Sequence, residues 1–208
     1  MYREMSQLIE PKKKIQLYKA LKIGYTRDER KQAQALKKYG YVLDRELTNP
    51  RENVVAWNPS QKKLLYISQG TDPTSFKDIK TDIALGTGGI KQTVRYQEEK
   101  NALLKAQKKY GAESNQVHLV GHSLSGQLVN LLAPSGSHAI TYNAAYTPGQ
   151  KVRPEVTNYR TKGDVFSVFA PKETTTTLGR ENAPAIPTPN ALLKAHNIEN
   201  LKQAKIYV

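Results

Sequence analysis

The chain has 208 residues, of which 38% are hydrophobic, and 32 Lys and Arg against 18 Asp and Glu leave a net charge of +14. This length suits one domain with a hydrophobic core, so we expect a single domain over residues 1–208. The chain has no cysteine, which excludes disulfides, thiolate metal sites and a cysteine nucleophile, and no apolar run of about 18 residues that would form a transmembrane helix.

The first residues and the basic composition bear on location and partners. Residues 1–7 are polar and no apolar signal core follows them, so we find no secretory signal and expect an intracellular protein. The positive charge favours anionic partners, either an anionic membrane surface met peripherally or nucleic acid. The basic residues are dispersed, as on many soluble surfaces, and no nucleic-acid-binding motif accompanies them.

The N-terminal segment, residues 1–40, has an amphipathic helical pattern. Asp28 is placed to cap a helix that runs from Arg30 to Lys38, and Gly40 is placed to end it. The pattern leaves two interpretations open for this segment, a helical layer packed on the domain or an arm that binds a partner.

The middle of the chain changes from helix to strand signals and back. Three short strands separated by turn residues predict a meander at one side of a sheet, at 41–47, 53–57 and 63–68. Residues 74–110 are mostly helical in pattern, with an interruption at 86–89 and a second helix from about Lys91 to Gly111. The interruption, Gly86-Thr87-Gly88-Gly89, does not match a phosphate-binding loop, and we interpret it as a flexible turn or the hinge of a lid.

Strands and helices alternate in the second half. An apolar strand at 117–121 is followed by a leucine-rich helix and a strand at 139–143, and further strands are expected at 156–161, 165–169 and 205–208. Residues 171–190, rich in proline and threonine, predict a long loop of functional or mobile character. The alternation predicts a three-layer α/β fold, a mostly parallel sheet flanked by helices with the small meander at one side.

The segment 117–126 carries the main chemical signal. An apolar strand runs into Gly121-His122-Ser123 and then into a helix, which is the context of the G-x-S-x-G nucleophile elbow of the α/β-hydrolase fold. The fifth position of that pattern is Ser125, and Gly126 follows one place later. The alternative is an ordinary strand–helix junction with Ser123 as an N-cap. The preceding strand and following helix favour the elbow, with Ser123 as nucleophile.

A nucleophilic serine needs a base, and the base needs an orienting acid, in the chain order Ser, acid, His for this fold. After Ser123 the chain has one aspartate, Asp164, and two histidines, of which His138 precedes Asp164 and His196 follows it. Alone, Asp164 reads as a turn residue and His196 as a surface helix residue. Their order after the elbow predicts the catalytic residues Ser123, Asp164 and His196.

The motifs resemble those of the class 3 lipase family of α/β-hydrolases over about residues 41–200. Residues 121–124 resemble that family's G-H-S-L-G-G elbow, and residues 64–71 resemble its strand with an F-R-G-T turn, with Ser68 and Gln69 in place of the aromatic residue and the arginine. Asp78 and Asp82 are similar to the D-W-x-x-D segment that follows the turn.

The resemblance implies a lipase, esterase or phospholipase acting on fatty-acyl esters, with an acyltransferase sharing all but the final acceptor. It implies that the backbone N–H groups of Thr71 and Leu124 form the oxyanion hole, that Asp78 and Asp82 are structural, and that His122 is a neighbour of the nucleophile. No cofactor is expected, and no metal site, since His118 and His122 lack accompanying ligands. The competing hypothesis is a catalytically weakened hydrolase scaffold that binds anionic lipid or nucleic acid, because Gln69 and Ser125 depart from the family pattern.

Overall fold

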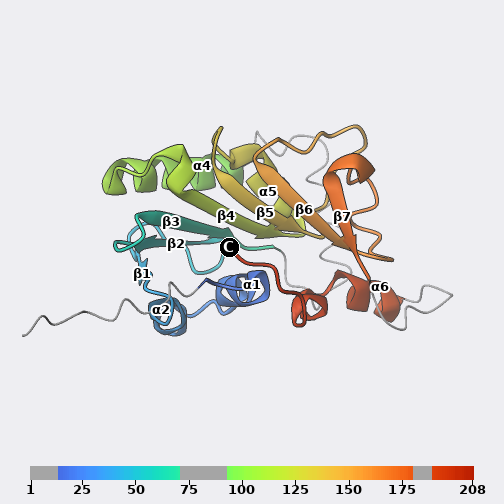
Figure 1. Ribbon diagram of the computed structural model, residues 1–208, viewed down its shortest axis with the longest axis horizontal. Coiled ribbons are helices and arrows are strands. Elements are labelled where there is room, and N and C mark those ends of the chain that lie inside the picture. The colour runs from blue at the N-terminus through green and yellow to red at the C-terminus, as the bar shows by residue number, and fades with distance from the viewer. Residues whose placement is uncertain (1–13, 71–92, 180–188) are drawn as a thin grey trace, which may run out of the picture.

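The structure is a computed structural model, and it describes residues 14–70, 93–179 and 189–208. Within these residues a seven-stranded sheet has its strands in chain order, β1 to β7 (Figure 1). The strands are β1 (Val42–Leu43), β2 (Asn53–Asn58), β3 (Lys63–Ser68), β4 (Val117–His122), β5 (His138–Tyr142), β6 (Val156–Thr161) and β7 (Thr175–Leu178). The β1–β2 and β2–β3 pairs are antiparallel, and each later neighbour is parallel.

Helices cover both faces of this sheet. One face carries α1 (Leu17–Tyr25), α2 (Glu29–Lys37) and the 3₁₀ turn η4 (Ile198–Leu201), which directly follows α6 (Pro189–His196). The other carries α4 (Val94–Tyr110) and α5 (Leu124–Leu132), as Figure 1 shows. The predicted mostly parallel, helix-flanked sheet with a meander at one side is therefore confirmed.

The strand sequences explain this layering. Successive strand residues point to opposite faces, so Leu65 and Ile67 of β3 pack in the α1 core whereas Leu64 and Tyr66 pack in the α4–α5 core. Because both faces are covered, β3 and β4 read as nearly continuous apolar runs. The carboxyl ends of the parallel strands then meet along one edge, where polar side chains gather.

Local signals set the helix ends. The Asp28 carboxylate accepts hydrogen bonds from the N–H groups of Arg30 and Lys31, as predicted for an N-cap. The Thr93 hydroxyl caps α4, which ends at Gly111 with a φ of 59°. In the described part of the N-terminal segment, α1 contacts β3, β4 and η4, so this helix packs on the sheet.

Two strand predictions and one loop prediction were wrong. Residues 165–169 form turns, because the Asp164 carboxylate accepts hydrogen bonds from the N–H groups of Phe166 and Ser167 and bends the chain. The predicted loop contains β7, a threonine run whose branched side chains suit a strand at a sheet edge. Residues 205–208 contribute a single bridge, Gln16 to Tyr207.

Thr71, Asp78, Asp82 and the interruption at 86–89 lie outside the described residues.

Candidate functional site

Ser123 occupies the turn between β4 and α5 with φ 61° and ψ −130°. This is an unfavourable backbone conformation for a residue with a side chain, and it persists only where the surroundings hold it. The Ser123 N–H donates to the Tyr142 carbonyl at 3.2 Å, and the Ser123 carbonyl accepts from Gly126 at 3.0 Å and Ala145 at 3.1 Å. The turn thus has the strained strand-to-helix geometry of a nucleophile elbow.

Close backbone contacts around this turn explain its glycines. A Cβ atom on Gly121 would lie 2.5 Å from the Ser125 carbonyl oxygen, and one on Gly126 would lie 2.6 Å from the Ala144 Cβ. On the neighbouring strand end, a Cβ on Gly70 would lie 2.5 Å from the His122 carbonyl oxygen. Glycine is therefore required at 121, 126 and 70, while position 125 has room for a side chain.

The Ser125 hydroxyl joins the ends of two strands to the start of α5. It accepts a hydrogen bond from the His122 N–H at 3.0 Å. Its own proton can be donated to either of two carbonyl oxygens, that of Ser68 at 2.9 Å or that of His122 at 2.8 Å. The departure from the family pattern at Ser125 therefore adds contacts to the turn.

Asp164 and His196, the predicted acid and base, are both buried and hydrogen-bonded to each other, with His196 Nδ1 2.9 Å from Asp164 Oδ1. Because the carboxylate accepts, Nδ1 carries the proton, and Nε2 has a free lone pair when the ring is neutral. Ser167 donates to the other carboxylate oxygen, through its hydroxyl at 2.5 Å and its N–H at 3.1 Å. Burial raises the pKa of Asp164, but the His196 charge and these hydrogen bonds outweigh it and leave the pKa below its usual value.

His122 lies beside the nucleophile and links it to the base. Its ring centroid is 4.7 Å from that of His196, its Nε2 is 2.8 Å from the His196 carbonyl oxygen, and its Nδ1 is 2.7 Å from the Tyr25 hydroxyl. Burial, followed by the His196 charge, lowers the pKa of His122 to about 3. The ring is therefore neutral, donates from Nε2 to the carbonyl and accepts from Tyr25, so it orients its neighbours and is no proton acceptor at neutral pH.

The structure brings the predicted site residues together only in part. Asp164 and His196 are in contact, and Ser123 adjoins His122, whose ring contacts His196. Ser123 Oγ and His196 Nε2 are buried, and neither makes a hydrogen bond within the described residues. Leu124 is the first residue of α5, where backbone N–H groups have no partner within the helix. Thr71 lies outside the described residues.

Two positioning residues have no clear signal in the sequence. Tyr25, at the end of α1, reaches His122 from a helix far away in the chain. Asn143, in a left-handed conformation directly after β5, donates to the carbonyls of Ala195 at 3.1 Å and His196 at 3.2 Å. A polar residue after a buried strand is a weak hint for Asn143, and no local pattern identifies Tyr25.

A buried ion pair supports the end of β3. The Arg95 guanidinium donates to the Gln69 carbonyl and to Glu99 Oε1, the latter at 2.8 Å, and the Glu99 side chain is only 1% exposed. Burial raises the pKa of Glu99, although the Arg95 charge opposes the rise. The Gln69 amide donates to the Pro50 carbonyl at 2.6 Å. An arginine from α4 thus binds the main chain just after the end of β3.

Within the described ranges, no group of three or more His, Asp or Glu residues is arranged to hold a metal ion. None of the helices in those ranges has the length and apolar character to cross a membrane.

Comparison with known proteins bears on the fold. No protein-family model matches the sequence, and the search of curated proteins finds no match. The solved structure of the extracellular lipase LipA from Serratia marcescens is similar, with a TM-score of 0.50 and 14% sequence identity over 84% of this chain. The match covers 40% of LipA, so the chain spans about two fifths of that protein. At this identity the similarity concerns the fold, and the chain has an α/β-hydrolase-like fold similar to that of a lipase.

Proposed function

We propose that the protein is a serine hydrolase of carboxylic esters, with Ser123 as nucleophile, His196 as general base and Asp164 as the orienting acid. One observation carries the proposal, the strained backbone of Ser123 at a strand–helix turn whose neighbour, His122, contacts the buried Asp164–His196 pair. Backbone strain of this kind is concentrated at functional sites. A buried aspartate beside a histidine stabilises the imidazolium that forms during catalysis, and this offsets the cost of burying the carboxylate.

The reaction follows from the protonation states of these groups. His196 Nε2 removes the proton of the Ser123 hydroxyl as Oγ attacks the ester carbonyl, and Asp164 stabilises the resulting imidazolium. The N–H of Leu124, with that of Thr71, donates to the oxyanion, each donor contributing on the order of 3 kcal/mol in comparable sites. The imidazolium then protonates the departing alcohol, and water, activated by the same base, releases the acid.

The unpaired Ser123 Oγ and His196 Nε2 atoms agree with this step. A buried hydroxyl and a buried ring nitrogen that find no partner among the described residues are costly, and their pairing during the reaction removes that cost. Hydrogen bonds between catalytic groups are often loose in free enzymes and tighten when substrate binds.

For the substrate we propose fatty-acyl esters, including phospholipids, in the manner of the class 3 lipases. Val165, Val168 and Phe169 follow Asp164 within five residues and have exposed apolar side chains, and we propose that these side chains contact the acyl chain. The net charge of +14 favours approach to an anionic lipid surface.

A fluorophosphonate probe tests the nucleophile, because it phosphonylates only activated serines. We expect labelling at Ser123, none in Ser123→Ala, and labelling slowed by about two or more orders of magnitude in Asp164→Asn, whose imidazole loses its orienting charge. Ser137→Ala, a buried serine outside the site, is the matched control and should be labelled like wild type.

Absence of labelling in wild-type protein that is folded by circular dichroism would contradict the hydrolase and favour the scaffold that binds anionic lipid or nucleic acid. With labelling established, nitrophenyl esters of increasing acyl length report the substrate class. We expect kcat/KM to rise with chain length, and a preference for acetate would contradict the fatty-acyl substrate.

A further inference from the structure

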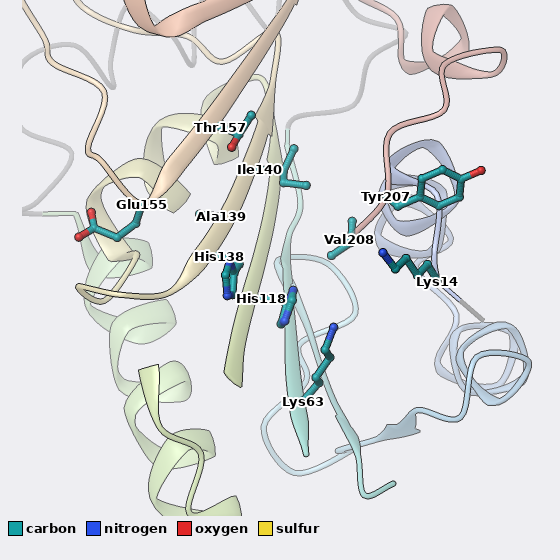
Figure 2. Close-up of a pocket in the computed structure, with 10 residues that line it drawn as sticks. All are labelled: Lys14, Lys63, His118, His138, Ala139, Ile140, Glu155, Thr157, Tyr207 and Val208. Carbon is teal, nitrogen blue, oxygen red and sulfur yellow. The ribbon is translucent and has the colours of Figure 1, made fainter. Parts of the chain in front are cut away.

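A cavity lies at the opposite end of the parallel strands from Ser123. Its volume is about 280 Å³, and Figure 2 shows it between the amino-terminal ends of the strands and the segment that carries Tyr207. Ten residues line it, namely Lys14, Lys63, His118, His138, Ala139, Ile140, Glu155, Thr157, Tyr207 and Val208. The bridge between Gln16 and Tyr207 holds the two chain segments that form its outer wall.

The strand register gathers its polar groups on one face. His118 of β4 pairs directly with His138 of β5, and their rings are stacked with centroids 5.0 Å apart. Leu65 of β3 pairs with His118, so Lys63, two residues earlier, shares the face of both imidazoles. Thr157 of β6 pairs with Ile140 and places a hydroxyl on that same face. Figure 2 shows the Lys63 side chain directed toward His118.

His118 is the central group of this cavity. Its side chain is 9% exposed, and neither ring nitrogen makes a hydrogen bond within the described residues, although the ring lines the cavity. Burial, then the charges of Lys63 and His138, lower the pKa of His118 to about 4. The imidazole lies beside cations and lines the cavity, so a ligand bound there could accept a hydrogen bond from its N–H group.

Among the side chains that line the cavity, two lysines are positively charged and one glutamate is negatively charged. Lys14 and Lys63 approach it from two sides, and the carboxylate of Glu155 is turned away from the imidazoles in Figure 2. That carboxylate lies 3.6 Å from Arg153. A hydrogen bond from its own backbone N–H, and then bonds from Ser135 and Gly136 and the Arg153 charge, lower its pKa. Lysines beside histidines oppose a divalent cation and favour an anion.

We propose that this cavity binds a phosphate group, with Lys63 and Lys14 as charge partners and His118, His138 and Thr157 as hydrogen-bond donors. Phosphate offers several acceptor oxygens, which matches a set of donors arriving from five chain segments. The site lies at the other end of the strands from Ser123 and does not depend on the function proposed above.

Histidine NMR with the full chain tests the proposal directly. Imidazole signals are recorded at about pH 6.5, the ordinary pKa of histidine. The protein is titrated with inorganic phosphate and, in a separate experiment, with sodium chloride at matched ionic strength. We expect saturable shifts of the His118 and His138 signals, assigned with His118→Gln and His138→Gln, and unchanged signals of His122 and His196. Lys63→Gln should weaken phosphate binding about tenfold, and Lys63→Arg should retain most of it. Lys100→Gln, an exposed lysine on α4 on the other side of the sheet, is the matched control.

Further arms distinguish the source of the phosphate. Glycerol 3-phosphate represents a soluble phosphomonoester, and phosphatidylcholine vesicles with or without phosphatidic acid represent a lipid headgroup. Saturable binding of any of these that Lys63→Gln weakens supports the site and names its source. Shifts that chloride reproduces, or phosphate binding that Lys63→Gln leaves unchanged in a folded variant, would overturn it.

Discussion

At the scale of single residues, the turn around Ser123 depends on which positions tolerate a Cβ atom. Gly121 and Gly126 face neighbouring atoms so closely that a side chain would collide, whereas Ser125 uses its side chain to bond two strand ends. Of the two positions where the family pattern has paired glycines, 126 requires glycine for steric reasons, whereas 125 accepts a small polar residue. Serine at 125 is compatible with an intact elbow.

This interpretation predicts a loss of stability in Ser125→Ala. The substitution leaves the buried His122 N–H and the Ser68 carbonyl without this partner, which costs about 1–3 kcal/mol per unsatisfied group. Urea unfolding followed by circular dichroism measures the change. Ser137→Ala is the control and should change stability little, since the buried Ser137 hydroxyl makes no hydrogen bond within the described residues. Equal stabilities of Ser125→Ala and wild type would refute the hydroxyl's role.

At the scale of elements, α4 supports the end of β3 through Arg95 and Glu99. The guanidinium bonds the Gln69 carbonyl, one residue before Gly70, and its partner carboxylate also lies 3.4 Å from the Tyr66 hydroxyl on β3. The helix thus supplies, from another part of the chain, a positive charge at the strand end. Because the strand end leads into the predicted oxyanion turn, this contact would position a catalytic donor.

We expect Arg95→Met to be strongly destabilising, by about 3–5 kcal/mol, since it leaves Glu99 buried and unpaired. The double variant Arg95→Met with Glu99→Gln should recover part of that loss, because no buried charge remains. A double-mutant cycle of unfolding free energies measures the coupling, and additive effects would show that the pair is unimportant. If Arg95 positions the turn, the folded double variant should still be labelled by the fluorophosphonate more slowly than the wild type.

At the scale of the whole molecule, buried titratable groups make stability depend on pH. The folded-state pKa of His122 is lowered to about 3 and that of His118 to about 4, whereas both titrate near about 6.5 in the unfolded chain. Between these values the unfolded state binds more protons, so stability falls as pH falls. Asp164 acts at lower pH, because its lowered pKa contributes stability above about pH 3.9 that is lost on further acidification.

We therefore expect the free energy of unfolding to fall steadily from about pH 6.5 to about pH 4. His118→Gln should make this slope shallower, removing a term on the order of 3 kcal/mol across the window at about 1.4 kcal/mol per pKa unit. Urea unfolding in phosphate-free buffers measures the slope, with Lys100→Gln, which replaces an exposed lysine on α4, as control. A slope that His118→Gln leaves unchanged would show that His118 titrates normally in the folded protein.

Much of the architecture is readable from local patterns. The apolar runs of β3 and β4, the Asp28 cap and the glycine that ends α4 each carry their signal within a few residues, so the sheet and its flanking helices are predictable. The strand predicted at 165–169 was wrong because its apolar side chains lie on the surface. The loop predicted over 175–178 was wrong because this polar segment forms a strand at the edge of the sheet. Periodicity reports which residues are apolar, and tertiary contacts decide which are buried.

By itself, the sequence determined the order of Ser123, Asp164 and His196 and the strand–turn–helix context of the first of them. Only the tertiary structure decided that Asp164 and His196 meet, that Tyr25 and Asn143 orient the histidines around them, and that Arg95 takes a place at the end of β3. It also brought Lys63, His118 and His138 to one face, through the pairing of three strands. Contacts between distant segments depend on strand register and helix docking, which no local spacing encodes.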